Sequence, residues 1–344
     1  MGKRILIEGL MHLGDLVASS AIIRPIKRKY PNSEIIYLVT PGLVEAAKAM
    51  PDVDGVLIYE YKSGGSLGGV WQLSRRIKEE KYDIFISFDP RDRTAIAAWL
   101  GKVPVRLATD SVFGWPVNWV KQSFFTQFTA FRDFDLNMHL TGETFLEGVH
   151  RMLDVDIYSN DRPALHVPVE AVESILAQVN QLNGTMMKKS SYVCMCLSTV
   201  DKRRSWSIEH WVTTISYILQ HVGSVILVGT KEDYSLASTV IQRLPEKFRA
   251  CIVNFCGKTS LLELFAILQG ARLTVNIDNG IGHIAAALCC PTVTLFPTQS
   301  PSRFLPMGIE AVAVTPSEDL GGITVEAVIS AISQCDKLKS FRDE

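Results

Sequence analysis

Short apolar runs alternate with longer amphipathic stretches along the first half of the chain. The apolar runs are rich in β-branched residues and cover 4–9, 34–40, 55–60 and 83–88. The first run is followed by a turn and a predicted helix from about Asp15 to Lys29, which Pro31 stops. Continuous apolar strands that alternate with helices are typical of parallel sheets covered on both faces. The first half therefore predicts one doubly wound sheet.

The same pattern restarts near residue 191. The apolar runs of the second half cover 191–198, 224–230, 250–255, 272–278 and 291–296. Between the halves, residues 159–170 contain two prolines and a polar cluster, which is typical of a linker. We expect an α/β protein with two domains, 1–165 and 166–344, each a doubly wound parallel sheet, facing a central cleft. In such sheets ligands bind at the carboxyl ends of the strands.

A turn of small and polar residues separates two apolar runs at 276–288 (NIDNGIGHIAAAL). Glycine lets a backbone approach a ligand closely, and the first amides of the helix, through Ile284, are expected to be free donors that favour an anion such as phosphate. Asp278 is placed to accept from a hydroxyl. The alternative is an Asp or Asn cap on a buried helix, with no ligand. The candidate residues are Asp278, Asn279, Gly280, Ile281, Gly282 and His283.

The first half has a comparable turn, with Gly14 and Asp15 between the first strand and the first helix. It does not match the GxGxxG fingerprint of dinucleotide-binding proteins. A single aspartate at this place is a helix N-cap or a catalytic carboxylate, and the residues themselves leave both open.

Composition narrows the class of protein. The chain has 344 residues, 47% of them apolar and 21% charged, with a formal net charge of -1. This balance indicates a globular protein and argues against nucleic acid as the partner. No apolar run reaches the roughly 18 residues of a membrane-spanning helix, and the N-terminus is expected to form a strand and not a signal peptide.

The seven cysteines show no CxxC pair and no histidine spacing suited to zinc. Cys194 and Cys196 alternate along a predicted strand, and Cys289 and Cys290 lie in an apolar run. We expect buried free thiols in a reducing cytoplasm.

Two segments resemble the signatures of glycosyltransferase family 9, the ADP-heptose:lipopolysaccharide heptosyltransferases. Residues 13–35 (LGDLVASSAIIRPIKRKYPNSEI) resemble the family's Leu-Gly-Asp turn, helix and basic stretch ending in Tyr-Pro. Residues 255–301 resemble its second signature, an Asp-Thr-Gly turn followed by a histidine and an Ala-rich helix. The likeness covers most of 3–315. It implies a GT-B fold, with Rossmann-like domains that hold the acceptor (1–165) and the nucleotide sugar (166–344), and a last helix that packs back on the first domain.

The resemblance implies roles for individual residues. Asp15 matches the family's proposed general base. Residues 202–211 (KRRSWSIEHW) resemble the segment that grips the donor diphosphate, with Lys202 nearby and Arg204 on the basic position, where lysine is common. Glu232 falls on the acid that meets the ribose, and Asp278 on the acid near the donor sugar. The chain departs from the pattern at Asn279, where threonine is usual, and at Met11 and His12, where small or hydroxyl residues are usual.

These residue types suit transfer from a nucleotide sugar. A carboxylate takes the acceptor's proton, and a cation with helix amides stabilises the leaving diphosphate. No metal or other cofactor is then required. The three Asp-x-Asp patterns, at 52–54, 133–135 and 154–156, lie far from the donor turns and are interpreted as turn or cap acids.

An aromatic stretch at 112–131 contains two tryptophans and five phenylalanines. It is either a patch on the acceptor side or membrane surface, or ordinary core beneath a long loop. Arg91, Arg93 and Arg106 lie on the same half and are candidates for binding an acidic acceptor; a solvated surface is the alternative for each.

The sequence thus predicts an inverting, metal-independent transferase that moves heptose from ADP-heptose to a lipopolysaccharide inner core or a related envelope acceptor. The expected partners are a nucleotide sugar, an acidic glycolipid and the inner face of the inner membrane, where a cytoplasmic protein would bind peripherally. Alternatives are another nucleotide sugar or a protein acceptor, a catalytically silent nucleotide-sugar-binding protein, and a GT-B-like epimerase.

Overall fold

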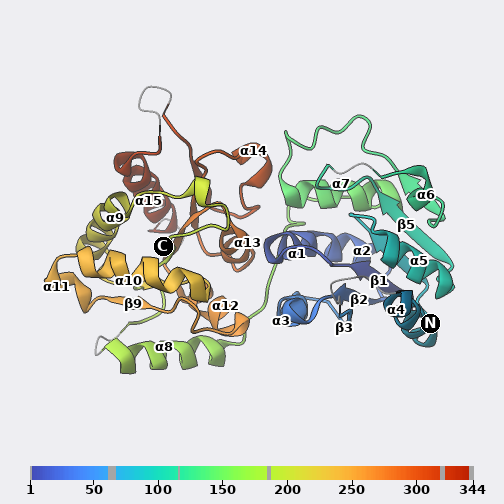
Figure 1. Ribbon diagram of the computed structural model, residues 1–344, viewed down its shortest axis with the longest axis horizontal. Coiled ribbons are helices and arrows are strands. Elements are labelled where there is room, and N and C mark those ends of the chain that lie inside the picture. Colours follow the sequence, from blue (N-terminus) through green and yellow to red (C-terminus); the bar gives the residue numbers. More distant parts are fainter. Residues whose placement is uncertain (1, 61–66, 115–116, 184–186, 318–321, 341–344) are drawn as a thin grey trace. The chain divides into compact units, whose positions relative to one another are not determined.

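The computed structural model describes residues 2–60, 67–114, 117–183, 187–317 and 322–340. The chain forms two compact units, Met1–Ala164 and Leu165–Glu344, each with a sheet between helices (Figure 1). The division falls one residue before the predicted boundary, in the segment 154–168, which is neither helix nor strand.

The first unit contains a six-stranded parallel sheet in the order β3-β2-β1-β4-β5-β6. Its strands are β1 (Arg4–Glu8), β2 (Glu34–Val39), β3 (Gly55–Ile58), β4 (Ile84–Ser87), β5 (Val105–Thr109) and β6 (Gln127–Thr129). The direction of the order reverses between β1 and β4, which is the switch point where ligands bind in such sheets. The sequence did not indicate β5 and β6, because β5 carries an arginine among small residues and β6 has only three residues.

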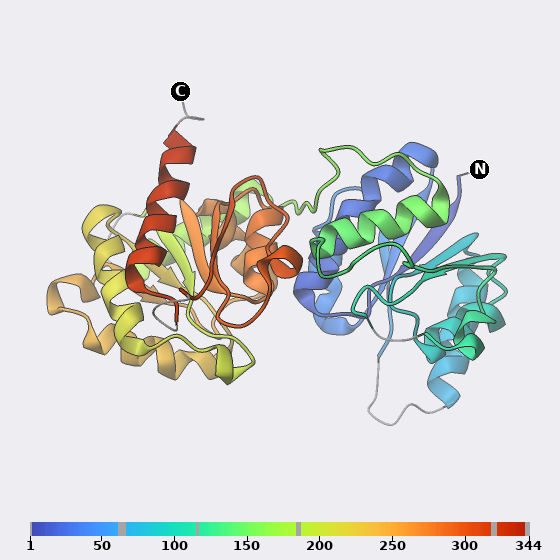
Figure 2. The ribbon, with the colours of Figure 1, turned by 90° about the horizontal axis from the view of Figure 1, so that it is seen from above.

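Helices cover both faces of this sheet (Figure 2). Leu6, Leu38 and Phe85 pack against α4 and α5 on one face, and α1, α2 and α7 lie on the other. The helical elements are α1 (Leu13–Ser19), η1 (Ser20–Ile22), α2 (Ile23–Lys29), η2 (Pro41–Leu43), α3 (Val44–Lys48), α4 (Leu67–Glu80), α5 (Asp92–Leu100), α6 (Trp119–Gln122) and α7 (Thr141–Leu153).

The single helix predicted from about Asp15 to Lys29 is in fact two helices joined by the 3-10 turn η1. The hydroxyls of Ser19 and Ser20 donate to the carbonyls of Leu16 and Val17, at 2.7 and 2.6 Å. Such side-chain bonds compete with the helical ladder and bend it.

The second unit repeats the same strand order, as β12-β11-β10-β7-β8-β9. Its strands are β7 (Val193–Cys196), β8 (Val225–Leu227), β9 (Ile252–Asn254), β10 (Leu273–Ile277), β11 (Thr292–Leu295) and β12 (Ala311–Val314). The switch point lies between β7 and β10. The sequence did not indicate β12, an edge strand that is only partly buried.

The core of the second unit packs Val193, Met195 and Val275 of the sheet against Trp211 and Ile332. This face of the sheet is covered by α9, α10 and α15. The opposite face is covered by α8, α12 and α13, of which α12 contacts both of the others. The helical elements are α8 (Val169–Asn183), η3 (Lys202–Arg204), α9 (Ile208–His221), η4 (Lys231–Asp233), α10 (Tyr234–Arg243), α11 (Glu246–Arg249), α12 (Leu261–Gly270), α13 (Gly280–Ala287), α14 (Pro301–Phe304) and α15 (Val325–Ser340).

The last helix, α15, packs on β10, β11, β12 and α9 of its own unit. Its expected packing on the first domain stays a prediction. None of the helices in the described ranges is both long and apolar enough to cross a bilayer.

Candidate functional site

Three turns that carry predicted donor residues meet at one edge of the second sheet. Arg204 follows β7, Glu232 follows β8 and Asp278 follows β10, and these three strands are neighbours in the sheet. Because the strands are parallel, their carboxyl ends lie at the same edge. The fold therefore brings together residues that are far apart in the sequence, beside the switch point between β7 and β10.

Arg204 and Asp278 form the polar centre of this edge. Nη1 of Arg204 donates to Oδ2 of Asp278 at 2.7 Å and lies 3.3 Å from its main-chain oxygen. The two side chains are 17% and 11% exposed. Burial raises the pKa of Asp278, and the guanidinium acts in the opposite direction. The pair is thus partly removed from water.

One donor of Arg204 has no hydrogen-bond partner among the residues that the structure describes. Its Nε is buried, and Oδ2 of Asp201 is 3.9 Å from it, beyond hydrogen-bond distance. A buried donor left without an acceptor is unfavourable by about 1–3 kcal/mol, and more for a charged group. An anionic ligand at this edge would supply the acceptor.

The N-terminus of α13 is capped by Asn279. Its Oδ1 accepts from the amide of Ile281 at 2.9 Å, and its Nδ2 donates to the carbonyl of Ser198 at 2.9 Å. The cap interpretation is therefore confirmed for Asn279, and the expectation that every early amide of this helix is free is wrong at Ile281. The amides of Gly280 and Gly282 have no acceptor among the residues that the structure describes, which leaves them available for an anion.

Close packing surrounds Gly282, and burial changes the pKa of His283. A Cβ on Gly282 would lie 3.0 Å from Nδ2 of Asn276 and from Cγ of Pro306, so glycine is needed here for close approach of the protein to itself. His283 is only partly exposed, and burial of its imidazole lowers its pKa to about 4. The ring is neutral at neutral pH and can donate or accept one hydrogen bond.

Glu232 is exposed in η4, at the turn after β8. Hydrogen bonds from its own amide and from the Thr230 hydroxyl lower its pKa, so it is a carboxylate at neutral pH. The neighbouring Asp233 caps η4 by accepting from Thr230. The predicted donor residue Lys202 has a side chain that lies outside the described part of the structure.

In the first unit, Asp15 is the third residue of α1, which follows β1 at the switch point. The N-cap is His12, so the N-cap alternative for Asp15 is wrong: the helix begins two residues before Asp15, at Leu13. Asp15 is partly buried within the first turn, where the helix dipole favours a negative charge.

The three arginines predicted to bind the acceptor separate into two groups. Arg91 lies in the turn after β4, and Arg93 lies in the first turn of α5. Because β4 is next to β1, both arginines lie at the same edge of the sheet as Asp15. Arg106 lies at the start of β5, where Nε donates to the carbonyl of Phe124 at 2.6 Å. This is the opposite edge of the sheet, so the contacts do not favour its predicted acceptor role.

Sequence reasoning missed Glu8, a buried carboxyl at the end of β1. It accepts from Ser87 Oγ at 2.6 Å and from Thr94 Oγ1 at 2.7 Å, and burial raises its pKa to about 7. The bonds tie the ends of β1 and β4 to the first turn of α5. An acid in an otherwise apolar strand, RILIE, was the signal that could have identified it.

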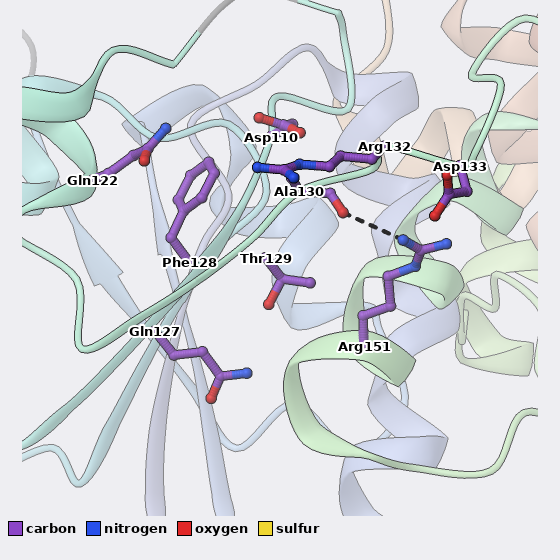
Figure 3. A pocket seen from close by; sticks show the side chains of 9 residues that line it. All are labelled: Asp110, Gln122, Gln127, Phe128, Thr129, Ala130, Arg132, Asp133 and Arg151. Carbon is purple, nitrogen blue, oxygen red and sulfur yellow. Dashed lines mark hydrogen bonds between the residues drawn. The ribbon is translucent and has the colours of Figure 1, made fainter.

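A pocket of about 780 Å³ opens beside β6 and α7 in the first unit (Figure 3). Two arginines, Arg132 and Arg151, and two aspartates, Asp110 and Asp133, line it together with glutamine side chains. Arg151 Nη1 donates to the carbonyl of Ala130 at 3.3 Å. None of the predicted site residues lines this pocket.

The other sequence predictions have mixed outcomes. In the aromatic stretch, Phe125 and Phe131 are buried, whereas Trp119 is exposed; Trp115 lies outside the described residues. Of the cysteines, Cys289 is exposed, so its expected burial is wrong, and all seven are free thiols.

Of the Asp-x-Asp acids, Asp52 lies in a turn and Asp154 is the left-handed C-cap of α7, as expected. Asp54 lies in neither a turn nor a cap and accepts from the amide of Ile35. Among the described residues, no group of three or more His, Cys, Asp and Glu side chains is arranged to hold a metal ion.

Comparison with known proteins agrees with this architecture. The chain is 22% identical to lipooligosaccharide heptosyltransferase 2 of Haemophilus influenzae over 315 residues, covering 90% of this chain and 88% of the relative. A glycosyl transferase family 9 structure from Veillonella parvula superposes with a TM-score of 0.84 at 20% identity, covering 97% of each chain.

The structure of Escherichia coli ADP-heptose lipopolysaccharide heptosyltransferase II gives a TM-score of 0.80 at 18% identity, covering 98% of this chain and 99% of that one. These similarities show the GT-B fold that the sequence implied. The family model for glycosyltransferase family 9 (heptosyltransferase) matches residues 70–320. The chain therefore belongs to glycosyltransferase family 9.

Proposed function

We propose that the protein is an inverting, metal-independent heptosyltransferase that moves heptose from ADP-heptose to a lipopolysaccharide inner core or a related envelope acceptor. The observation that carries the proposal is the buried Nε of Arg204, which has no hydrogen-bond partner in the described part of the chain, beside the N-terminus of α13. A cation and free helix amides at one strand edge are the groups that a leaving diphosphate needs. The relatives named above support heptose and ADP.

The donor is held by the second unit. Arg204 and the amides of Gly280 and Gly282 bind the diphosphate, and Glu232 accepts hydrogen bonds from the ribose hydroxyls. Asp278 orients Arg204 through their 2.7 Å contact and accepts from a hydroxyl of the donor sugar. Lys202 and His283 complete the proposed donor residues. Because Arg204 and the amides neutralise the developing charge, the chemistry requires no metal ion.

The acceptor is held by the first unit, with Arg91 and Arg93 toward its acidic groups. The acceptor hydroxyl attacks the anomeric carbon of heptose from the face opposite the diphosphate. The new carbon–oxygen bond forms as the bond to the diphosphate breaks, ADP leaves, and Asp15 takes the hydroxyl proton. A single displacement inverts the anomeric configuration. We place the reaction on the cytoplasmic face of the inner membrane, where a lipid-anchored acceptor is available.

Nucleotide binding tests the donor assignment. Since a ligand that binds only the native state raises the apparent stability, ADP and ADP-heptose are expected to raise the melting temperature, and UDP and UDP-sugars far less. Equal stabilisation by UDP-sugars would remove the ADP-heptose assignment. Stabilisation by ADP-heptose without any turnover on acceptor glycans would instead indicate a silent binding protein.

A further inference from the structure

Three of the described tryptophans are exposed, and all three lie on helices of the first unit. Five of the six tryptophans lie in the described residues. Trp206 and Trp211 are buried in the second unit, whereas Trp71, Trp99 and Trp119 are 63%, 50% and 78% exposed. A contiguous group of exposed apolar side chains indicates an interaction site, whereas single exposed ones are ordinary.

The three tryptophans lie on three helices, of which α5 contacts both of the others. Figures 1 and 2 show α4, α5 and α6 side by side in the first unit. The helices α4 and α5 pack against each other. The Trp99 ring packs edge-on against Phe124, which follows α6, at 5.8 Å between centroids. Leu100 and Val120 add exposed apolar side chains to these helices.

The charge of these three helices differs in sign from that of the whole chain. The helices α4, α5 and α6 contain five lysines and arginines against three acids, whereas the whole chain carries -1. Lys78 and Lys102 are exposed, and Lys121 of α6 lies 3.6 Å from Asp92 of α5. Basic residues interleaved with exposed tryptophans suit a surface that is anionic outside and apolar beneath.

We infer that the flank formed by α4, α5 and α6 docks the protein on an anionic lipid bilayer, with Trp71, Trp99 and Trp119 entering the headgroup layer. Indole rings favour that layer because one edge is apolar and the N–H is polar. Each lysine or arginine near an anionic bilayer adds about 1 kcal/mol of attraction. The inference rests on the proposed function, since a lipid-anchored acceptor requires the enzyme at the membrane surface.

Vesicle sedimentation with the full chain tests the inference. Wild type is expected to sediment with vesicles of phosphatidylethanolamine and phosphatidylglycerol, less with phosphatidylcholine alone, and less at high salt. The double variant Trp71→Gln/Trp119→Gln is expected to partition onto the vesicles at least about tenfold less, because it loses the two indole rings that would enter the headgroup layer. Trp99 is left intact because it packs on Phe124. Met138→Gln, an equally exposed change outside the flank, should bind like wild type.

Three results would overturn the inference: no vesicle binding by wild type, equal binding by wild type and the double variant, or a wild-type dimer that the double variant dissociates. The last would make the flank a self-association surface. The vesicles carry no glycan, so binding does not depend on the acceptor. The nucleotide melting experiment stays a separate test, and its failure would remove the proposed donor without changing vesicle binding.

Discussion

At the residue scale, Arg204 is bonded to Asp278 through Nη1 while its Nε has no hydrogen-bond partner among the described residues. Arg204→Ala is therefore expected to weaken ADP binding by roughly tenfold or more, because a hydrogen bond to a charged group contributes about 1.5–3 kcal/mol. Arg204→Lys keeps the charge but loses the planar guanidinium group, so its affinity for ADP should lie between those of wild type and Arg204→Ala. Titration calorimetry with ADP measures the effect.

Arg203→Ala is the matched control for this experiment. Arg203 is the neighbouring cation, its side chain is 87% exposed, and it binds Asp201 instead of Asp278. Its removal should leave ADP affinity unchanged. A larger loss with Arg203→Ala than with Arg204→Ala would show that the diphosphate faces the other arginine.

The buried carboxyl group of Glu8 leads to a second prediction at the residue scale. Burial raises its pKa to about 7, so between about pH 4.5 and 7 the native state holds a proton that the unfolded chain has released. The free energy of unfolding contributed by Glu8 is therefore fully present at low pH and falls as pH rises through 7, by on the order of 3 kcal/mol.

Glu8→Gln isolates this contribution, because an uncharged amide of the same shape can still bond Ser87 and Thr94. We expect the stability of the variant, relative to wild type, to rise by about 1–3 kcal/mol between pH 5 and pH 8 in urea unfolding. Glu45→Gln, an exposed change on α3, is the control. A pH-independent difference between Glu8→Gln and wild type would mean that Glu8 is ionised throughout this range.

At the element scale, the N-terminus of α13 depends on one side chain. Asn279 caps the helix and also joins the turn after β10 to the turn after β7 through the Ser198 carbonyl. Asn279→Ala should lower the free energy of unfolding by about 1 kcal/mol, within the 0.5–2 range for a lost cap. Asn279→Thr, which restores the residue usual in the family, should retain most of the cap. Thermal unfolding of the three proteins without ligand separates these outcomes, and equal stability of all three would contradict the capping role.

The same element shows why glycine occurs beside the cap. A side chain at position 282 would meet Asn276 and Pro306 at 3.0 Å, so the helix sits close to β10 and the chain after it. The amides of the first turn are therefore held in place by packing before any ligand arrives. Donors that are already in place before the reaction can stabilise the negative charge that develops on a leaving group.

At the scale of the whole molecule, the proposed base and the proposed donor residues belong to different compact units. Asp15 lies in Met1–Ala164, and Arg204 and Asp278 lie in Leu165–Glu344. Asp15→Asn is therefore expected to lower the rate of transfer by about 100-fold or more, since an amide cannot take a proton. The affinity for ADP should not change. Turnover with a glycan acceptor and ADP calorimetry measure the two effects.

The position of Asp15 in the first turn of α1 sets the control. Loss of its charge near the helix N-terminus should lower stability by only about 0.3–1 kcal/mol, so the variant should fold. Asp89→Asn changes the acid after the neighbouring strand, β4, and should leave the rate near wild type. The reverse result, a slow Asp89→Asn and a normal Asp15→Asn, would move the base to Asp89.

The amino-acid sequence by itself determined the two-sheet architecture and the place of the donor turns. Nine of the twelve strands follow from apolar runs, because a strand buried on both faces must be apolar along its length. The edge strands β6 and β12 and the arginine-containing β5 escaped this pattern, since their partial exposure admits polar or small residues. The family resemblance came from two local motifs, which are read directly from the chain.

Only the tertiary structure decided which polar groups are paired and which are left over. That Asn279 is used by its own helix, that Nε of Arg204 lacks a partner, and that Glu8 is a buried acid all depend on contacts between residues far apart in sequence. The same holds for the exposure of the three tryptophans of α4, α5 and α6. The sequence does not distinguish them from Trp206 and Trp211, which are buried. Burial and hydrogen bonding are properties of surroundings, and the surroundings exist only once the sheets and helices have packed.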